Sequence, residues 1–302
     1  MEVREKNKMP TIQRQTLRTV LVTLAFIGGL VAVLSPPEAQ ARHVDRSRLN
    51  VMQLNIAGWS INKANLAVAD RLVDSVADRA PGLPLAVSVN EVCFQQWERL
   101  YNRLQVLGYT GHFGPSIFHD PKKDPACEGK AFGNAIFWLG GHAEAKTFWI
   151  PDSHQIHGAA TEEKRNMVCG RPYFPERTWY CSVHLVNGED THSREVRRQQ
   201  ADDIRAIANV LNTEHRAIIM GDFNMSKDEP AMQQWFNGFW LDADNDRDGR
   251  PTWRSTKNKT ITRKLDYIMV RADRFSFGHD AFIIEVAGST DHWLVQGYPV
   301  FK

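Results

Sequence analysis

The amino-acid sequence predicts an α/β fold in which helices cover the faces of mixed β-sheets. Strand-like runs recur along the chain and alternate with amphipathic helix-like runs, a pattern typical of helices packed on sheets. Several strand-like runs follow one another without a helix between them, which predicts hairpins and therefore sheets of mixed strand direction. With 302 residues, 42% of them hydrophobic, the chain can bury a large core, and no repeat or linker divides it.

The expected strands are short apolar runs, and the expected helices are the amphipathic segments between them. The strands are residues 49–56, 85–90, 134–139, 179–186, 216–220, 264–270 and 281–286. The helices are residues 65–79, 94–107 and 195–211, each with apolar side chains at helical spacing. Residues 111–133 are polar and contain three prolines, so we expect them to form a long functional loop.

The N-terminal segment has the organisation of a secretory signal peptide. Basic residues precede an apolar run at 19–34, and Ala39, Gln40 and Ala41 then form a small-residue cleavage site. The apolar run is short for a membrane-spanning helix, so we expect no permanent membrane span, with a retained anchor as the alternative. Cleavage after Ala41 would leave a secreted, extracellular domain of residues 42–302.

The charge balance of the expected mature protein is neutral. Residues 1–41 carry five basic and three acidic residues, which leaves 32 of each sign from the 37 and 35 of the whole chain. Overall charge therefore gives no argument for a polyanionic partner, although a local basic patch stays open.

The four cysteines all lie in the expected mature domain and predict two disulfides. An even number of cysteines behind a signal peptide indicates a disulfide framework, and four cysteines allow three pairings. We favour Cys169–Cys181, because the segments around them resemble neighbouring strands of a hairpin, and this leaves Cys93–Cys127. A four-cysteine zinc site is the alternative, but no C-x-x-C pair supports it.

Polar side chains with catalytic chemistry stand at the ends of the strand-like runs. They are Asn55, Glu91, His184, Asp222 and Asn224. Strand ends present side chains to a common mouth, where converging carboxylates repel each other unless a cation joins them. The pattern therefore predicts a hard divalent ion, Mg²⁺ or alternatively Mn²⁺. Asp222 and Asn224 are expected to face one side, because side chains alternate in extended chain.

Each of these residues also has a structural interpretation when taken alone. Glu91 would complete the dipole of the helix expected at 94–107, and a lone histidine such as His184 is often a satisfied core residue. Asp266 interrupts an apolar run and needs a partner. We pair it with His292 rather than pairing His292 with the adjacent Asp291, because neighbouring side chains in extended chain point apart.

Two further patterns have simpler interpretations. One matches the first half of an EF-hand loop, but Ser255 stands where that loop needs glutamate, so we interpret it as an acidic turn: it comprises Asp244, Asp246, Asp248 and Gly249. The other is an aromatic cluster that we expect to form the buried face of a short helix and strand: Trp235, Phe236, Phe239 and Trp240.

The ordered motifs resemble the endonuclease/exonuclease/phosphatase superfamily, which includes deoxyribonuclease I. The motifs are QLN at 53–55, NE at 90–91, the histidine at 184, GDFN at 221–224, LDY at 265–267 and DH at 291–292. The resemblance covers about residues 49–300. It implies a four-layered α/β sandwich, with two mixed β-sheets packed face to face and helices outside.

The resemblance also implies roles for the site residues. The metal would be held by Glu91, with Asn55 nearby and Asp291 in support. Five residues would do the chemistry: His184, Asp222, Asn224, Asp266 and His292. Asp222 and Asn224 would orient water and phosphate. Asp266 and His292 would form a proton-handling dyad, and His184 would donate to the phosphate or the leaving oxygen. Whether Asp222 or His292 is the base stays open.

The sequence departs from deoxyribonuclease I at one position. In that enzyme a glutamate orients the second histidine, and residues 109–133, where the resemblance would place it, offer no identifiable counterpart. The expected function is a secreted, Mg²⁺-dependent phosphodiesterase, a monomer that acts on nucleic acid. The alternatives are a sphingomyelinase-type enzyme acting on a phospholipid head group, a phosphatase on the same fold, and a non-catalytic or toxin-like subunit.

Overall fold

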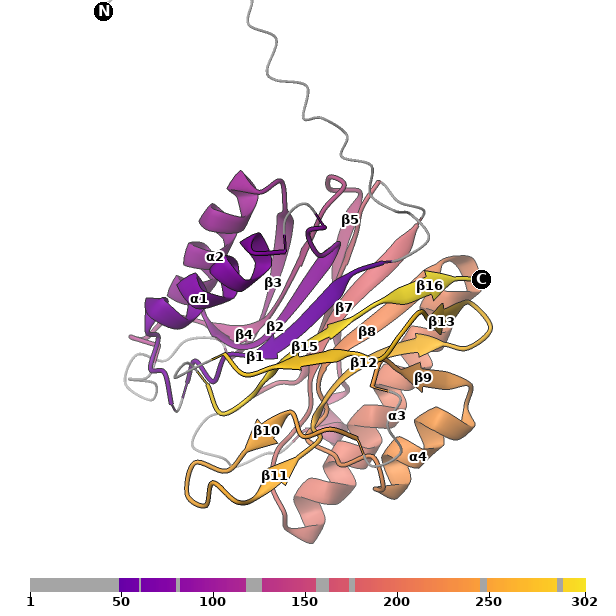
Figure 1. Cartoon of the computed structure of the whole chain (residues 1–302). Coiled ribbons are helices and arrows are strands. Elements are labelled where there is room, and N and C mark those ends of the chain that lie inside the picture. Colours follow the sequence, from indigo (N-terminus) through magenta and orange to yellow (C-terminus); the bar gives the residue numbers. More distant parts are fainter. Residues whose placement is uncertain are drawn as a thin grey trace, which may run out of the picture. The chain divides into compact units, whose positions relative to one another are not determined.

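Two six-stranded β-sheets pack face to face, and helices cover the outer face of each (Figure 1). This computed structural model describes residues 49–59, 61–79, 82–117, 127–155, 163–173, 177–244, 249–286 and 290–302. The predicted signal peptide, 1–41, lies outside these residues, as do Asp246 and Asp248 of the acidic turn. The layered arrangement confirms the predicted α/β sandwich.

The first sheet has one parallel strand pair among antiparallel neighbours. Its strands are β1 (Val51–Asn55), β2 (Ala86–Cys93), β3 (Thr110–Ile117), β4 (Phe132–Trp138), β14 (Phe282–Ile284) and β15 (Leu294–Gly297). They are ordered β14-β15-β1-β2-β4-β3. The pair β1–β2 is parallel, since helix α1 (Leu66–Ala77) connects the two strands as a crossover. Helix α2 (Phe94–Val106) follows β2 directly.

The second sheet repeats this plan. Its strands are β5 (Glu144–Trp149), β6 (Asn166–Arg171), β7 (Thr178–His184), β8 (Arg216–Asp222), β9 (Trp240–Asp242) and β12 (Asp266–Arg271). They are ordered β5-β6-β7-β8-β12-β9, and only β7 and β8 are parallel. Helix α3 (Thr191–Glu214) connects β7 to β8, and α4 (Pro230–Asn237) follows β8.

Short elements complete the domain. A 3-10 turn, η1, spans Asp152–His154, and β13 (Phe275–Phe277) pairs with β16 (Pro299–Phe301). Strands β10 (Trp253–Arg254) and β11 (Thr262–Arg263) form a hairpin that lies below the two large sheets in Figure 1. The β10–β11 hairpin contributes to the site described below.

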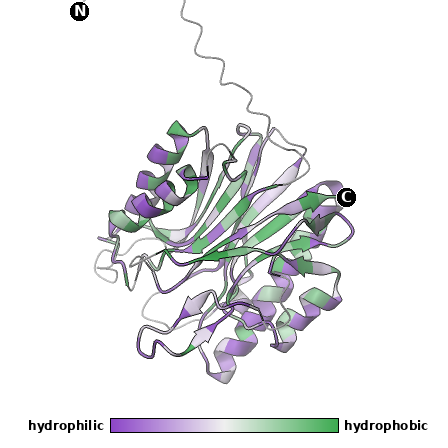
Figure 2. Cartoon of the chain, viewed as in Figure 1, coloured by the Kyte–Doolittle hydropathy of each residue, from purple (hydrophilic) through white to green (hydrophobic). Residues whose placement is uncertain are grey.

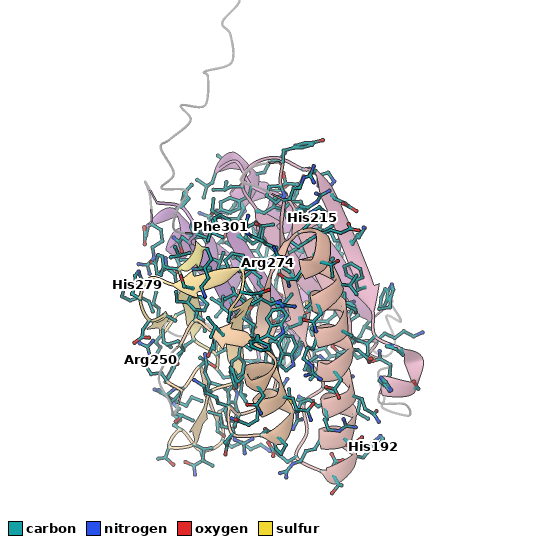
Figure 3. The ribbon with its side chains drawn as sticks, turned by 90° about the vertical axis from the view of Figure 1, so that its right-hand side faces the viewer. His192, His215, Arg250, Arg274, His279 and Phe301 are labelled. Atoms are coloured by element: carbon teal, nitrogen blue, oxygen red, sulfur yellow. A yellow bond between two sulfur atoms is a disulfide. The ribbon has the colours of Figure 1, made fainter. Side chains whose placement is uncertain are left out.

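Helices α1 and α3 begin where a side chain caps free backbone N–H groups. The Asn65 side chain accepts a hydrogen bond from Ala67 N (3.0 Å) at the start of α1, and Asp190 accepts one from Ser193 N (2.9 Å) at the start of α3. Figure 3 shows α3 crossing its face from His192 near one end to His215 at the other. The predicted helix 195–211 is therefore part of a longer one, because capping begins it four residues earlier than the apolar pattern does.

Apolar residues form three layers of core. Strand residues alternate between the two faces of a sheet, so Met52 and Leu54 pack under α1 and α2 while Val51 faces the other sheet. In β8, Ile219 packs under α3 and α4, whereas Ile218 faces inward. Figure 2 shows the strands as mostly hydrophobic and the helices as two-sided. Because each sheet is apolar on both faces, it packs against helices on one face and against the other sheet on the other, which gives the order helix, sheet, sheet, helix.

The structure corrects two of the sequence predictions. Residues 110–117 form β3 rather than loop, and Gly114 fits there because a Cβ would come within 2.2 Å of Val168 in the opposite sheet. In the aromatic cluster, Trp235 and Trp240 are buried as expected, but the Phe239 side chain is 71% exposed. Phe239 has a left-handed backbone (φ 69°) in the turn between α4 and β9, which turns it outward.

The acidic turn has a structural explanation at Asp244. This buried carboxylate accepts hydrogen bonds from the backbone N–H of Arg250 (2.8 Å) and from its guanidinium (3.0 Å). Both of its oxygens are thereby occupied by protein donors.

The predicted disulfides Cys93–Cys127 and Cys169–Cys181 both form. Cys169 and Cys181 lie directly opposite each other in the β6–β7 pair, as the hairpin interpretation requires. No helix within the described ranges has the length and apolar character needed to cross a bilayer. Two disulfides are compatible with an extracellular protein.

Candidate active site

The eight predicted site residues come together where strands of the two sheets end. The first sheet supplies Asn55 and Glu91 from its strands, and Asp291 and His292 lie just before its strand β15. The second supplies His184, Asp222 and Asp266 from its strands, and Asn224 lies just after β8. The strand register of the second sheet brings three of these residues side by side: Asp222 lies opposite His184 on one neighbouring strand and opposite Asp266 on the other. The site is therefore assembled from both sheets.

Asn55 joins the two halves. Its Nδ2 donates to Glu91 Oε1 (3.1 Å) and to Asp222 Oδ2 (3.0 Å), and its Oδ1 accepts from Ala57 N (2.9 Å). One carboxamide thus holds a carboxylate from each sheet and is itself held by the backbone. This arrangement keeps two like charges close together, which is unfavourable unless a cation balances them.

Glu91 is placed by a β-bulge. The sequence suggested that it follows the end of a strand, but β2 continues to Cys93, and its register with β4 shifts between Val89 and Val92. Glu91 has a left-handed backbone, φ 55°. Bulges redirect side chains next to active sites, and this one turns the Glu91 carboxylate to the end of the sheet.

Asp222 and Asn224 both line the same pocket, but not for the reason expected. Asn224 has φ 52°, so the chain there is not extended and simple alternation does not apply. Asn224 N donates to Asp222 Oδ1 (2.8 Å), and Asn224 Nδ2 donates to Leu185 O (3.0 Å), which fixes both side chains. The preceding Gly221 is needed because a Cβ would lie 1.9 Å from Val183 O.

Asp266 and His292 form the predicted dyad. His292 Nδ1 lies 2.8 Å from Asp266 Oδ2, whereas His292 Nε2 is 4.0 Å from Asp291 Oδ1. Burial opposes charging of this imidazole, but the carboxylates of Asp266 and Asp222 outweigh burial and raise the pKa of His292 to about 10. Trp253 Nε1 donates to Asp291 Oδ2 (2.8 Å), so the neighbouring carboxylate is oriented by the β10–β11 hairpin.

His184 has a partner that the sequence did not reveal. Arg165 Nη1 lies 2.9 Å from His184 Nδ1, and Arg165 in turn forms an ion pair with Glu163 (2.7 Å). The partner of His184 Nδ1 is therefore the guanidinium of the residue directly before β6. The resemblance to deoxyribonuclease I implies a carboxylate from residues 109–133, of which 118–126 lie outside the described residues. Burial lowers the pKa of His184 well below its usual range, and the positive charges of Arg165 and His292 lower it further.

A buried polar network between the sheets supports the site and was also missed. Asn90 Oδ1 accepts from Asp222 N (2.9 Å) and Gln53 Nε2 (2.7 Å), while Asn90 Nδ2 donates to Asn134 Oδ1 (3.0 Å) and Ser182 Oγ (3.1 Å). Asn90 is thus fully hydrogen-bonded in an environment without water access. The NE pair of the sequence signalled Glu91, but nothing in it distinguished Asn90 from a turn residue.

The charges of the site fit a divalent cation. Four carboxylates converge on it, those of Glu91, Asp222, Asp266 and Asp291, and the imidazolium of His292 lies among them. The guanidinium of Arg165, which contacts His184, is already balanced by Glu163. Burial raises the pKa of Glu91, and it raises the pKa of Asp222 to about 7 although His292 opposes the rise. A bound cation would favour the ionised forms of both groups.

The arrangement of possible ligands is compatible with such an ion. Among the described residues, ligand atoms of Asp222, Asp266 and His292 lie within 4.8 Å of one another. In this group Asp266 and His292 already hydrogen-bond to each other. The group does not contain Glu91 or Asp291, so the metal residues expected from the resemblance, Glu91 with Asn55 and Asp291, stay a prediction.

A pocket of about 250 Å³ opens over these groups. Glu91, Asp222, Asn224, Asp291 and His292 line it, whereas Asn55, His184 and Asp266 lie behind its wall. Its lining also includes residues of a different character: Ile61, Glu189, Trp253 and Arg263. Arg263 and Glu189 form an ion pair, so the β10–β11 hairpin is tied to the loop after β7.

Comparison with solved structures shows the same fold at low sequence identity. An endonuclease/exonuclease/phosphatase from Beutenbergia cavernae matches with a TM-score of 0.64 and 18% identity, over 85% of this chain and 72% of that one. The human Nocturnin catalytic domain with bound sulfate matches with a TM-score of 0.63 and 15% identity, over 85% and 94%. A mannosyl-6-phosphatase from Bacteroides thetaiotaomicron gives 0.59 and 16%, over 84% and 100%.

The family match covers most of the sequence. The model of the "Endonuclease/Exonuclease/phosphatase family" matches residues 52–292, a range that contains all eight predicted site residues. No curated protein sequence matches the chain significantly. The range of the match, the four-layered fold and the clustered acidic and histidine residues agree: this chain belongs to the endonuclease/exonuclease/phosphatase family of phosphoester hydrolases.

Proposed function

We propose that this chain is a secreted, Mg²⁺-dependent phosphodiesterase that cleaves nucleic acid in the manner of deoxyribonuclease I. The observation that carries the proposal is the convergence of four carboxylates and two buried imidazoles at the junction of the two sheets. His184 Nε2 and His292 Nε2 each lie 3.7 Å from Asp222 Oδ2. This places a carboxylate between two nitrogen groups, where a phosphate and an attacking water would be held together.

Asp222 is the residue we propose as general base. Its raised pKa of about 7 suits a group that accepts a proton near neutral pH, whereas His292, with a pKa of about 10, is held in its protonated form. As the water oxygen bonds to phosphorus, its proton would pass to Asp222 Oδ2, and His292 Nε2–H would stabilise charge on the phosphate. The P–O bond to the leaving oxygen would break, and that oxygen would take a proton from solvent. Asp266 keeps His292 in this orientation through its Nδ1. A divalent ion at Glu91, when bound, supplies positive charge for the phosphate oxygens.

The lining of the pocket supports nucleic acid as the substrate class. The indole of Trp253 provides an aromatic surface on which a base could stack. The guanidinium of Arg263, paired with Glu189, lines the same pocket. A structural neighbour named as a mannosyl-6-phosphatase indicates that a phosphomonoester belongs among the substrates to be tested. A phospholipid head group is the other alternative, so sphingomyelin belongs there too.

The test compares three substrates with and without metal. We expect the purified mature protein to nick plasmid DNA in Mg²⁺ and not in EDTA, with little release from sphingomyelin or p-nitrophenyl phosphate. His292→Ala should slow DNA cleavage by about a hundredfold or more, because it removes a charged donor to the phosphate. His192→Ala is the matched control, since His192 is exposed on α3 (Figure 3).

Several outcomes would reject parts of the proposal. If the protein hydrolyses sphingomyelin or p-nitrophenyl phosphate but does not cleave DNA, the proposed substrate class is wrong. Full activity in EDTA would reject the proposed dependence on a metal ion. Retention of activity in His292→Ala would reject the catalytic site. Secretion is tested separately: N-terminal sequencing of protein from the culture medium should begin at Arg42, and a retained apolar segment would contradict the signal peptide.

A further inference from the structure

We propose that Arg165 positions His184 and makes it a fixed hydrogen-bond donor to a non-bridging phosphate oxygen. The inference rests on the proposed phosphodiesterase function and adds to it a role for Nε2 of His184. In deoxyribonuclease I a carboxylate orients the equivalent histidine. Replacing that carboxylate with a guanidinium reverses the direction of the hydrogen bond, and this reversal decides what the histidine can do.

Strand pairing brings Arg165 to His184. Arg165 directly precedes β6, which pairs with β7 so that Met167 lies opposite Val183, and His184 is the last residue of β7. Arg165 Nη1 is 2.9 Å from His184 Nδ1 and 3.4 Å from the His184 carbonyl oxygen. Both side chains are buried, so water does not compete for this contact.

The chemistry of the pair fixes the tautomer. A guanidinium carries only donors, so Nδ1 of His184 must accept with its lone pair, and the proton of the ring is on Nε2. A carboxylate partner would instead accept from Nδ1–H and would favour the doubly protonated ring. With Arg165 in place, the ring has a single proton, and losing it would leave an imidazolate. His184 can therefore donate a hydrogen bond but is unsuited to giving up a proton.

Arg165 is itself held from two sides. Its Nη2 lies 2.7 Å from Glu163 Oε2, and Glu163 Oε1 accepts from Ser116 Oγ (3.3 Å). The Arg165 backbone N–H donates to Gln155 Oε1 (2.9 Å). The positive charge is thus compensated, and the guanidinium cannot turn away from His184 without breaking its ion pair with Glu163, while the Gln155 bond fixes the backbone from which it extends.

The other nitrogen of His184 lacks an acceptor of its own. Nε2 is buried and has no hydrogen-bond partner within the part of the chain that the structure describes. It lies 3.8 Å from Glu91 Oε1 and 3.7 Å from Asp222 Oδ2, and both of these residues line the pocket. Buried polar atoms are normally hydrogen-bonded, so this N–H is a donor awaiting an oxygen of the substrate. A non-bridging phosphate oxygen between Glu91 and Asp222 would supply it.

The tautomer is tested directly by long-range ¹H–¹⁵N NMR of the histidine rings, with His184→Ala used to assign the signals. In the wild-type protein we expect His184 to show a pyridine-type Nδ1 and a protonated Nε2. Arg165→Met should give mixed tautomers, and Arg165→Lys, which keeps a donor, should restore the single form. A protonated Nδ1 in the wild type, or an unchanged spectrum in Arg165→Met, would overturn the proposal.

The role is tested with two diesters that share one nucleotide and differ in the leaving group, p-nitrophenol or phenol. We expect His184→Ala to slow both reactions by a similar factor, about 10²–10³, since a non-bridging oxygen is common to them. Arg165→Met should slow both by about tenfold or more, and Arg165→Lys by less. A loss concentrated on the poorer leaving group, phenol, would show that His184 gives a proton and would overturn the inference.

Arg171→Met is the matched control. Arg171 stands at the other end of β6 and has the same kinds of partner, a glutamate (Glu144, 2.9 Å) and a histidine (His215, 3.4 Å), but it is remote from the site. It should leave rates and the His184 spectrum unchanged. A wild-type protein that cleaves neither diester would reject the proposed function, whereas the NMR result would still decide the tautomer.

Discussion

The ionisable residues of the site differ in how far burial and neighbouring charges shift their pKa values. His292 is the clearest case, because two carboxylates hold its proton against the cost of burial. Asp266→Asn should therefore lower the pKa of His292 from about 10 and reduce kcat by about a hundredfold or more, since the tautomer is no longer fixed. An NMR pH titration of His292 with parallel kinetics measures both effects. Asp273→Asn, which alters an exposed carboxylate paired with Arg271, is the control.

Asp222 links metal binding to pH. Its folded-state pKa, about 7, lies above the ordinary value of 3.8, so ionising it costs folding free energy as pH rises from about 4 to 7 in metal-free protein. A cation that binds the ionised site offsets this cost. Mg²⁺ should therefore raise the melting temperature more at pH 8 than at pH 5.5, relative to EDTA. Equal shifts at the two pH values would show that binding of the ion is not coupled to the ionisation of Asp222.

The sequence revealed some site residues and concealed others for a physical reason. Glu91, Asp222 and Asp266 were visible because each is an acid beside an apolar run, where only a functional or paired group is tolerated. Arg165 and Asn90 were not, since their importance comes from what they meet on other strands. No local pattern encodes the 2.9 Å contact between Arg165 and His184, which depends on how β6 pairs with β7.

At the scale of elements, the site depends on the two sheets keeping a fixed relation. Asn90 of β2 joins β8 through Asp222 N and β7 through Ser182. Asn90→Ala would leave these buried partners unsatisfied, at about 1–3 kcal/mol for each group that finds no substitute. We expect a large loss of stability in urea and a fall in kcat in the fraction that remains folded. Asn237→Ala, on the exposed surface of α4, should change neither.

Helices and strands whose apolar residues recur at regular spacing could be predicted from the sequence. Strands that form mainly because a neighbouring strand pairs with them could not. The strand at 110–117 contains Gly111, Gly114 and Pro115, so its sequence indicates loop. It is a strand because β4 offers it a long antiparallel edge. The short strands β9, β10 and β11 likewise have too few residues to show a period, and their pairing comes from the chain around them.

For the whole molecule, the two disulfides restrict the unfolded chain to different degrees. Their cysteines are separated by 34 and 12 residues, for which loop closure corresponds to about 4 and 3 kcal/mol respectively. Cys93→Ala/Cys127→Ala should therefore lower the melting temperature more than Cys169→Ala/Cys181→Ala. It should also lower activity at temperatures where the protein is folded, because Cys93 is two residues from Glu91. The opposite ranking would mean that native contacts rather than loop closure dominate.

The reactive groups are divided between the two large sheets. The pocket therefore keeps its geometry only while the two sheets keep their positions relative to each other. A slip of about one ångström between them would separate Asn55 from Asp222 while leaving each sheet's own hydrogen bonds intact. The rate of turnover should therefore respond to altered packing of the core between the sheets before any spectroscopic measure of secondary structure changes. Enlarging a void far from the chemistry, for example by Trp138→Leu, should slow the enzyme at temperatures where its circular dichroism is still native.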